Sequence, residues 1–323
     1  MIRVEGLTKD YGPHRAIDDL TFNAEEGEIL GFLGPNGAGK TTTMRILCGY
    51  MPPTLGKAEV SGYDVVDQSL EVRRRVGYMP ETVPLYPDMT VFDYLKYMAD
   101  LRHLKNVEDR VDGVIEKMNL EKRASSYISS LSKGLRQRVG LAQAIIHDPE
   151  VLILDEPTIG LDPAQIIEVR NLIRELGREH IVLLSTHILS EAQQVCNRVI
   201  IINNGKIVAG DTPERLQARL TGARRVSVQV GGDSDGLEEV LNNIPGIAHI
   251  STNVDGNIEF ETIPGQEPRP EVAKTIVSAG YDLLEMRPVG ISLENVFLQL
   301  TRDEPSHPES PEDEPIEDEE GVE

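Results

Sequence analysis

Four short runs of apolar residues mark the first two thirds of the chain, and each has the length of one buried strand. They span residues 29–33, 151–154, 181–184 and 199–202. Continuous apolar runs of this length are typical of strands that are buried on both faces of a parallel sheet. A helix is predicted between the second and third runs, because apolar residues share one helical face there: Ile166, Val169, Leu172, Ile173 and Leu176. The pattern therefore predicts an α/β fold built on βαβ units.

A different pattern occupies residues 88–130. Val91, Tyr94, Leu95 and Met98 fall at helical spacing, and residues 107–120 repeat this spacing with many charges. We expect a helical insertion with few strands here. The prolines at positions 80, 84 and 87 predict an exposed loop in front of it.

The residues after about 222 predict a second unit. Val226, Val228 and Val230 alternate as in a strand, a helix follows, and Asp255-Gly256 separates two segments as a hairpin turn would. Another helix, another strand and a last amphipathic helix give the order βαββαβα, which predicts a ferredoxin-like α+β unit. That last helix carries its apolar face at Leu293, Val296, Phe297 and Leu300.

Composition limits the class of protein. The 323 residues suffice for two domains, and the two cysteines, Cys48 and Cys196, favour a reducing cytosolic setting. No start segment resembles a secretory signal and no eighteen apolar residues run together, so we expect a chain that neither is secreted nor spans a membrane.

Charge argues against a nucleic-acid partner. The net charge is -22, whereas a phosphate backbone needs a concentrated basic surface. Eleven of the 54 acidic residues lie in residues 303–323, which contain no Lys or Arg. This acidic, proline-rich tail is expected to be disordered, and the rest of the chain is only mildly acidic.

The strongest chemical signal follows the first apolar run and matches the phosphate-binding pattern G-x-x-x-x-G-K-[ST] at every position. Glycines let backbone N–H groups turn toward phosphate oxygens, and the N-terminus of the next helix favours the same negative charge. Lys40 is expected to reach the β and γ phosphates, and the Thr41 hydroxyl to ligate Mg²⁺. The stretch predicts a nucleotide site made of Gly34, Pro35, Asn36, Gly37, Ala38, Gly39, Lys40, Thr41 and Thr42.

Other candidate site residues stand at predicted strand and helix ends. Asp155 and Glu156 follow a buried run, where Asp155 can organise Mg²⁺ and Glu156 can hold an attacking water as general base. His187 follows the next strand, so it can approach the γ phosphate. Ser132 is a good N-cap for a helix, and Tyr11 in a turn-like setting can stack on a base.

Taken together, these motifs resemble the ATP-binding subunit of an ABC transporter over residues 1 to about 220. The resemblance identifies residues 34–41 as the Walker A loop, 151–156 as Walker B with its catalytic glutamate, 160–162 as the D-loop, Tyr11 as the base-stacking aromatic and His187 as the switch histidine. It places Ser132 and Gly134 in the signature motif, which in the family binds the γ phosphate held by a second, head-to-tail chain. ATP and Mg²⁺ are the implied cofactors.

The chain departs from the family pattern at two motifs. The signature usually reads L-S-G-G-Q, whereas Lys133 and Leu135 stand here on either side of Gly134. Glu81 occupies the position of the Q-loop glutamine; it can still ligate Mg²⁺ or its water, but it adds negative charge near the γ phosphate. These variants are similar to ABC-2 type exporters, including drug-export and gliding-motility-like ATPases.

The resemblance implies an ATPase that powers transport, of the export type, through integral membrane permease subunits in trans. It implies a homodimer or heterodimer at the cytoplasmic face of the membrane. The expected domains are an ATPase domain (1–222) with a helical subdomain (about 82–145), an accessory domain (223–302) and the tail (303–323). Two alternatives remain open: a soluble ABC ATPase acting on a macromolecular complex, and an ATP-switched regulatory binding module.

Overall fold

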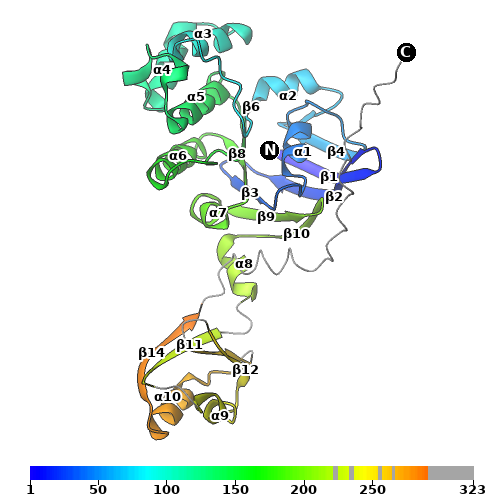
Figure 1. Cartoon of the computed structure of the whole chain (residues 1–323). Helices are drawn as coiled ribbons and strands as arrows, with labels where there is room; N and C mark the ends of the chain where they lie inside the picture. The colour runs from blue at the N-terminus through cyan, green and yellow to red at the C-terminus, as the bar shows by residue number, and fades with distance from the viewer. Residues whose placement is uncertain (221–224, 233–235, 254–256, 264–265, 290–323) are drawn as a thin grey trace, which may run out of the picture.

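The computed structural model describes the chain except for residues 221–224, 233–235, 254–256, 264–265 and 290–323. Its strands form three sheets, which Figure 1 shows with the helices around them. The predicted last helix, the acidic tail and the Asp255-Gly256 turn lie outside the described residues.

The N-terminal residues form an antiparallel sheet in the strand order β2-β1-β4-β5. Pairing of Tyr11 with His14 closes the hairpin between the first two strands. These strands have ten and eleven residues. The sheet consists of β1 (Ile2–Tyr11), β2 (His14–Ala24), β4 (Leu55–Val60) and β5 (Tyr63–Asp64).

The central sheet has six strands in the order β10-β9-β3-β8-β7-β6. Its neighbours are parallel except for the β9–β10 hairpin. The four apolar runs are confirmed as β3, β7, β8 and β9, whereas β6 was not predicted because its four residues are too few to show a period. The strands are β3 (Ile29–Leu33), β6 (Val76–Met79), β7 (Val151–Asp155), β8 (Ile181–Thr186), β9 (Arg198–Asn203) and β10 (Lys206–Asp211).

Alternate residues of the central strands enter two different cores, because successive side chains point to opposite faces. In β7, Leu152 and Leu154 pack in the core shared with helices α3 to α7, whereas Val151 and Ile153 pack in the core shared with α1 and the antiparallel sheet. This burial on both faces explains why the run is continuously apolar.

Helices of the predicted helical block lie at one end of the central sheet (Figure 1). Thr90 caps the first of them by accepting a hydrogen bond from the Asp93 N–H at 3.1 Å. The helices of this larger unit are α1 (Lys40–Leu47), α2 (Ser69–Arg75), α3 (Val91–Leu101), α4 (Val107–Lys117), α5 (Lys133–Ile145), α6 (Pro163–Leu176), α7 (Leu189–Val195) and α8 (Pro213–Leu220), with single 3-10 turns at Glu121–Arg123 and Ile128–Ser130.

The third sheet belongs to the C-terminal part and is antiparallel, in the order β12-β13-β11-β14. Its core joins Val228 and Phe260 of the sheet to Leu241 and Ile276 of two helices. The elements are β11 (Arg225–Gly231), α9 (Leu237–Leu241), β12 (Ile247–Thr252), β13 (Ile258–Thr262), α10 (Arg269–Ser278) and β14 (Asp282–Val289).

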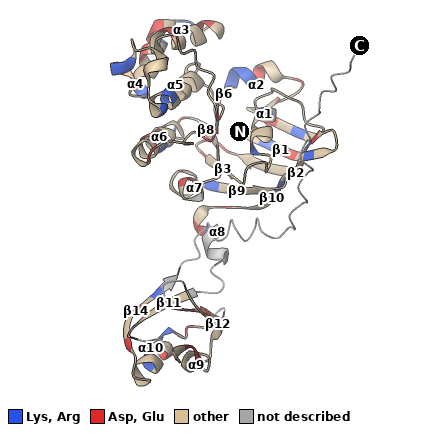
Figure 2. Cartoon of the chain, in the orientation of Figure 1, with Lys and Arg blue, Asp and Glu red and all other residues tan. Residues whose placement is uncertain are grey.

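Basic and acidic residues are mixed along the elements in Figure 2, and three arginines end α2. In the part of the chain that the structure describes, no helix combines the length and apolarity needed to cross a bilayer.

Candidate functional site

The phosphate-binding stretch leaves the buried strand β3 and enters α1 at Lys40. Gly39 has φ +102°, and a Cβ there would lie 2.5 Å from the Ala16 carbonyl oxygen. A Cβ at Gly34 would lie 2.4 Å from the Ile202 carbonyl oxygen. Any other residue would push the loop away from β2 and β9, so these two glycines fix its path between the two sheets.

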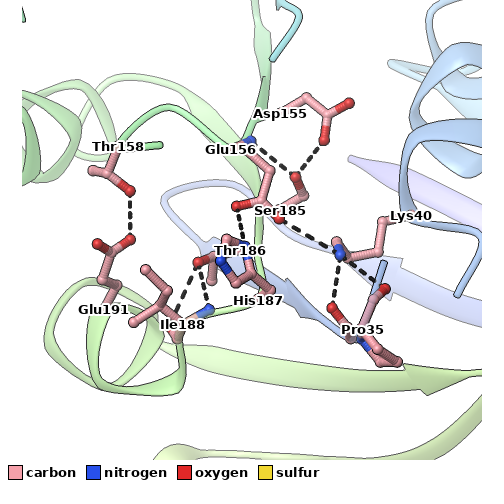
Figure 3. Close-up of polar contacts among 11 residues, drawn as sticks. Pro35, Lys40, Asp155, Glu156, Thr158, Ser185, Thr186, His187, Ile188 and Glu191 are labelled. Carbon is pink, nitrogen blue, oxygen red and sulfur yellow. Dashed lines mark hydrogen bonds and ion pairs between the residues drawn. The ribbon is translucent and has the colours of Figure 1, made fainter. Parts of the chain in front are cut away.

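The Lys40 side chain folds back over the loop and is 5% exposed. Its Nζ donates hydrogen bonds to the carbonyl oxygens of Gly34 (2.6 Å) and Pro35 (3.1 Å), and lies 3.5 Å from Glu156 Oε1 (Figure 3). The ammonium is thus held where the loop turns. This position also faces the catalytic glutamate that the sequence predicts.

The ends of β7 and β8 bring the predicted carboxylates together, because these strands are parallel neighbours with Asp155 opposite Ser185. The Ser185 hydroxyl donates to Asp155 Oδ1 and accepts from the Glu156 N–H at 3.0 Å. His187 Nδ1 lies 2.9 Å from Glu156 Oε2. Ser185, which the sequence reading passed over, therefore positions both carboxylates (Figure 3).

Glu156 is 6% exposed and has φ +49°, which is uncommon for a residue other than glycine. The hydrogen bond to Ser185 and the contact with His187 hold it in this conformation. Backbone strain of this kind clusters at functional sites.

A cavity of about 510 Å³ opens above the phosphate loop. It brings together most of the predicted nucleotide-binding residues with the predicted catalytic residues and Glu81, and it also includes three residues that were not predicted: His14, Ala16 and Ile159. The predicted residues that line it are Tyr11, Pro35, Asn36, Gly37, Gly39, Lys40, Thr41, Thr42, Glu81, Glu156 and His187.

Tyr11 stands at the rim of this cavity and is 45% exposed. Its hydroxyl lies 3.2 Å from Met51 Sδ, and Lys9 Nζ lies 5.6 Å from the ring centroid. His14 joins the site because the hairpin register places it beside Tyr11. No local signal in the sequence marks His14, since its position depends on strand pairing.

Of the residues predicted in the phosphate loop and at the end of β7, three do not line the cavity: Gly34, Ala38 and Asp155. Gly34 and Ala38 form the base of the loop, where Ala38 is buried and its carbonyl accepts from the Gly205 N–H at 3.1 Å. Asp155 lies buried behind Glu156, and its Oδ2 has no hydrogen-bond partner among the described residues. A buried carboxylate oxygen without a partner is costly unless a cation or donor binds it.

Mg²⁺ fits this donor set. Asp155 Oδ2 is a hard oxygen without a hydrogen-bond partner among the described residues, and Thr41 and Glu81, which also carry oxygen ligands, line the cavity together with Glu156. No cluster of three or more His, Cys, Asp or Glu side chains suited to a metal occurs among the described residues. A magnesium ion here would therefore share its coordination with phosphate oxygens and water, as is usual for this ion.

Ser132 and Gly134 lie elsewhere. They line a separate cavity of about 60 Å³ with Gln165 and Glu168. Ser132 caps α5 by accepting from the Leu135 N–H at 3.4 Å, as predicted. Within a single chain these two residues do not meet the cavity at Lys40.

Comparison with known proteins agrees with this geometry. Residues 17–159 match the sequence profile of the ABC transporter family. The chain is 35% identical over 304 residues to the bacitracin transport ATP-binding protein BcrA of Bacillus licheniformis, covering 93% of this chain and 97% of that protein. It is 34% identical over 307 residues to the daunorubicin resistance ATP-binding protein DrrA3 of Streptomyces coeruleorubidus, covering 94% and 96%.

A solved structure of an ATP-binding subunit of an ABC transporter superposes with a TM-score of 0.62 at 32% identity. It covers 68% of this chain and 93% of the other. The curated relatives extend over nearly the whole length of this chain. The match of fold, motifs and length leads to one conclusion: this chain belongs to the ATP-binding subunits of ABC transporters.

Proposed function

We propose that this chain binds ATP with Mg²⁺, hydrolyses it as one half of a head-to-tail pair, and powers export through a separate membrane-spanning partner. One observation carries the proposal. The cavity at Lys40 holds the loop, the general-base candidate and its histidine, whereas Ser132 and Gly134 open to a separate cavity of the same chain. A second chain is therefore needed to bring a signature segment to the phosphates.

In this proposal the phosphate loop amides and Lys40 bind the β and γ phosphates. Lys40 Nζ exchanges its bonds to the carbonyls of Gly34 and Pro35 for phosphate oxygens, which are stronger, charged acceptors. Tyr11 stacks on the base at the rim of the cavity. Thr41, Asp155 and Glu81 hold Mg²⁺, which when bound neutralises charge on the phosphates.

Glu156 then acts as general base. Its carboxylate takes a proton from the attacking water, and its Oε1 lies 3.5 Å from Lys40 Nζ. His187, whose side chain is 40% exposed, reaches from Glu156 toward the cavity and orients the carboxylate for the γ phosphate. General-base catalysis of this kind contributes about 10²- to 10⁴-fold in rate.

The wider assignment is also proposed. Residues 1–222 form the ATPase domain with its helical subdomain at about 82–145, and residues 223–302 form a ferredoxin-like accessory domain followed by the acidic tail. The strand order β12-β13-β11-β14 supports the ferredoxin-like assignment. The pair is a homodimer or a heterodimer with a similar chain, bound at the cytoplasmic face. The names of the relatives, bacitracin transport and daunorubicin resistance, support export.

The test uses Glu156→Gln in the full chain. We expect ATP binding to persist, turnover to fall by at least about 10²-fold, and a closed dimer to accumulate with ATP. Glu175→Gln, which neutralises an exposed carboxylate of α6, is the matched control and retains turnover. Wild-type turnover in Glu156→Gln contradicts the assignment of the base.

The transport role is tested by affinity purification of the Glu156→Gln chain from membranes with ATP. An integral membrane protein that co-purifies with this chain, and that does not co-purify with the Lys40→Ala variant, supports the proposal. Recovery of soluble partners alone favours an ATPase acting on a macromolecular complex.

A further inference from the structure

Lys133 stands at the first position of α5, between Ser132 and Gly134, and its side chain leaves the helix toward the loop after β7. The geometry at Gly160 locates its ammonium. A Cβ built on Gly160 would lie 2.1 Å from Lys133 Nζ, 3.3 Å from Cε and 3.8 Å from Cδ. The end of the lysine therefore lies against the glycine backbone, where a Cβ would displace it, and both residues are exposed.

Gly160 is held in this position by its own loop. It has φ +67°, which favours glycine. The Ile159 N–H donates to the Glu156 carbonyl at 3.2 Å, and the Leu161 N–H donates to the Thr158 carbonyl at 3.2 Å. The residue under the lysine is thus four positions from the general-base candidate, in one hydrogen-bonded turn.

The opposite side of this loop is anchored. The buried Thr158 hydroxyl donates to the buried carboxylate of Glu191 on α7 at 2.5 Å, and Asp162 caps α6 by accepting from the Gln165 N–H at 2.9 Å. The loop is thus anchored on both sides of Gly160, by Thr158 and by Asp162. Ile159, the residue next to Gly160 between these anchors, lines the nucleotide cavity.

The charge of Lys133 is not used by another group. In the described part of the chain, Lys133 makes no ion pair and its Nζ makes no hydrogen bond. The Arg136 guanidinium also has neither within the described residues. Lys133 and Arg136 line one cavity of about 400 Å³ together with Glu81 and Ile159. A cation in the first turn of a helix also opposes the helix dipole. Neither ion pairing nor helix stability favours a lysine at this exposed position, where its side chain lies against Gly160.

We infer that Lys133 is a positioning residue for hydrolysis: its contact with Gly160 ties the signature segment at Ser132 to the loop that follows Glu156 in the same chain. A shift of the start of α5 then moves Gly160 and the adjoining Ile159, which lines the nucleotide cavity. The contact links the segment at Ser132 to the wall of the chain's own nucleotide cavity.

The contact is tested by measuring kcat and KM for ATP in the purified full chain. We expect Lys133→Ala to lower kcat by about 3- to 30-fold, which corresponds to the coupling energies found along such contact networks. We expect the KM for ATP to stay within about twofold of that of the original chain. Lys133→Arg restores at least half of kcat, because its longer side chain still reaches Gly160. Arg136→Ala removes an equal charge from the same turn of α5 and stays within about twofold of the original chain.

A double-mutant cycle with Gly160→Ala makes the test specific. The methyl group added by Gly160→Ala displaces the end of Lys133. In the Lys133→Ala background there is no lysine to displace, so Gly160→Ala lowers kcat by a smaller factor there than in the original chain. In a Glu156→Gln background, Lys133→Ala raises the ATP concentration needed for half-maximal dimerisation by about 3-fold or more, which size-exclusion chromatography measures. Effects that multiply independently, a change confined to KM, or kcat equal to that of Arg136→Ala overturn the inference.

Discussion

Replacement of Ser185 by alanine removes one hydroxyl that supports both carboxylates of the site. The Ser185 side chain is fully buried, donates to Asp155 Oδ1 and accepts from the Glu156 N–H at 3.0 Å. Because Asp155 Oδ2 has no partner already, the substitution leaves the buried Asp155 carboxylate without any hydrogen bond among the described residues.

The magnitude follows from these two bonds. A hydrogen bond to a charged group contributes about 1.5–3 kcal/mol, and an unsatisfied buried N–H costs about 1–3 kcal/mol. Water can reach the site from the neighbouring cavity and recover part of this loss. We therefore expect Ser185→Ala to lower the free energy of unfolding by about 3 kcal/mol in the absence of nucleotide and divalent cations.

Thr158→Val is the matched control for stability. It removes a buried hydroxyl that donates to a different buried carboxylate, that of Glu191, with no second bond to the backbone. Its expected cost is smaller, about 2 kcal/mol. Urea unfolding followed by far-ultraviolet circular dichroism measures both, since the chain has no tryptophan. A loss below about 1 kcal/mol for Ser185→Ala, or one smaller than that of Thr158→Val, refutes the reasoning.

Three further predictions concern groups away from this pair. Burial, together with nearby arginines, lowers the pKa of His147 from 6.5 to about 3, so its contribution to stability is intact above pH 6.5 and is lost as the pH falls toward 3. At pH 5 we expect the free energy of unfolding to be about 2 kcal/mol lower than at pH 7.5. Urea titrations measure this difference, which His147→Gln removes. Gly39→Ala places a methyl group 2.5 Å from the Ala16 carbonyl oxygen at φ +102°, and is expected to abolish nucleotide binding in equilibrium dialysis and to cost about 3 kcal/mol or more of stability; normal ATP affinity would contradict the described loop. Burial raises the pKa of Cys196 to about 12 and raises that of the buried Cys48 thiol well above its usual value, so both thiols should resist a thiol reagent in the native chain and react after unfolding, and a thiol that reacts rapidly in the native chain would show that it is exposed.

The sequence predicted the central fold well because its signals are local. The run 151–154 is apolar at every position because both faces of β7 are buried, and that property is visible without knowing the neighbours. Helical spacing likewise revealed α3 and α6. The strand β6 and the helix α2 were missed, since four and seven residues are too few to establish a period.

The site was predicted to the extent that its residues follow one another in motifs. The stretch from Gly34 to Thr42 carries its chemistry within nine residues, so its glycines and Lys40 could be read directly. His14, Ile159 and Ser185 join the site only through strand pairing and loop geometry. Their residue types are ordinary, and the motifs near Ile159 and Ser185 do not show which neighbouring side chain enters the site.

The sequence by itself determined that a phosphate-binding loop follows a buried strand, that two carboxylates end another, and that a capped helix begins at Ser132. These features depend on backbone torsions and on neighbours within one or two turns of chain. Tertiary structure alone decided that Ser185 fixes both carboxylates, that Ser132 faces away from the cavity of its own chain, and that Lys133 rests on Gly160. The contacts of Ser185 and of Lys133 join segments about 30 residues apart in the sequence. The place of Ser132 depends on the direction in which its helix begins. Only the packing of the sheets and helices decides both.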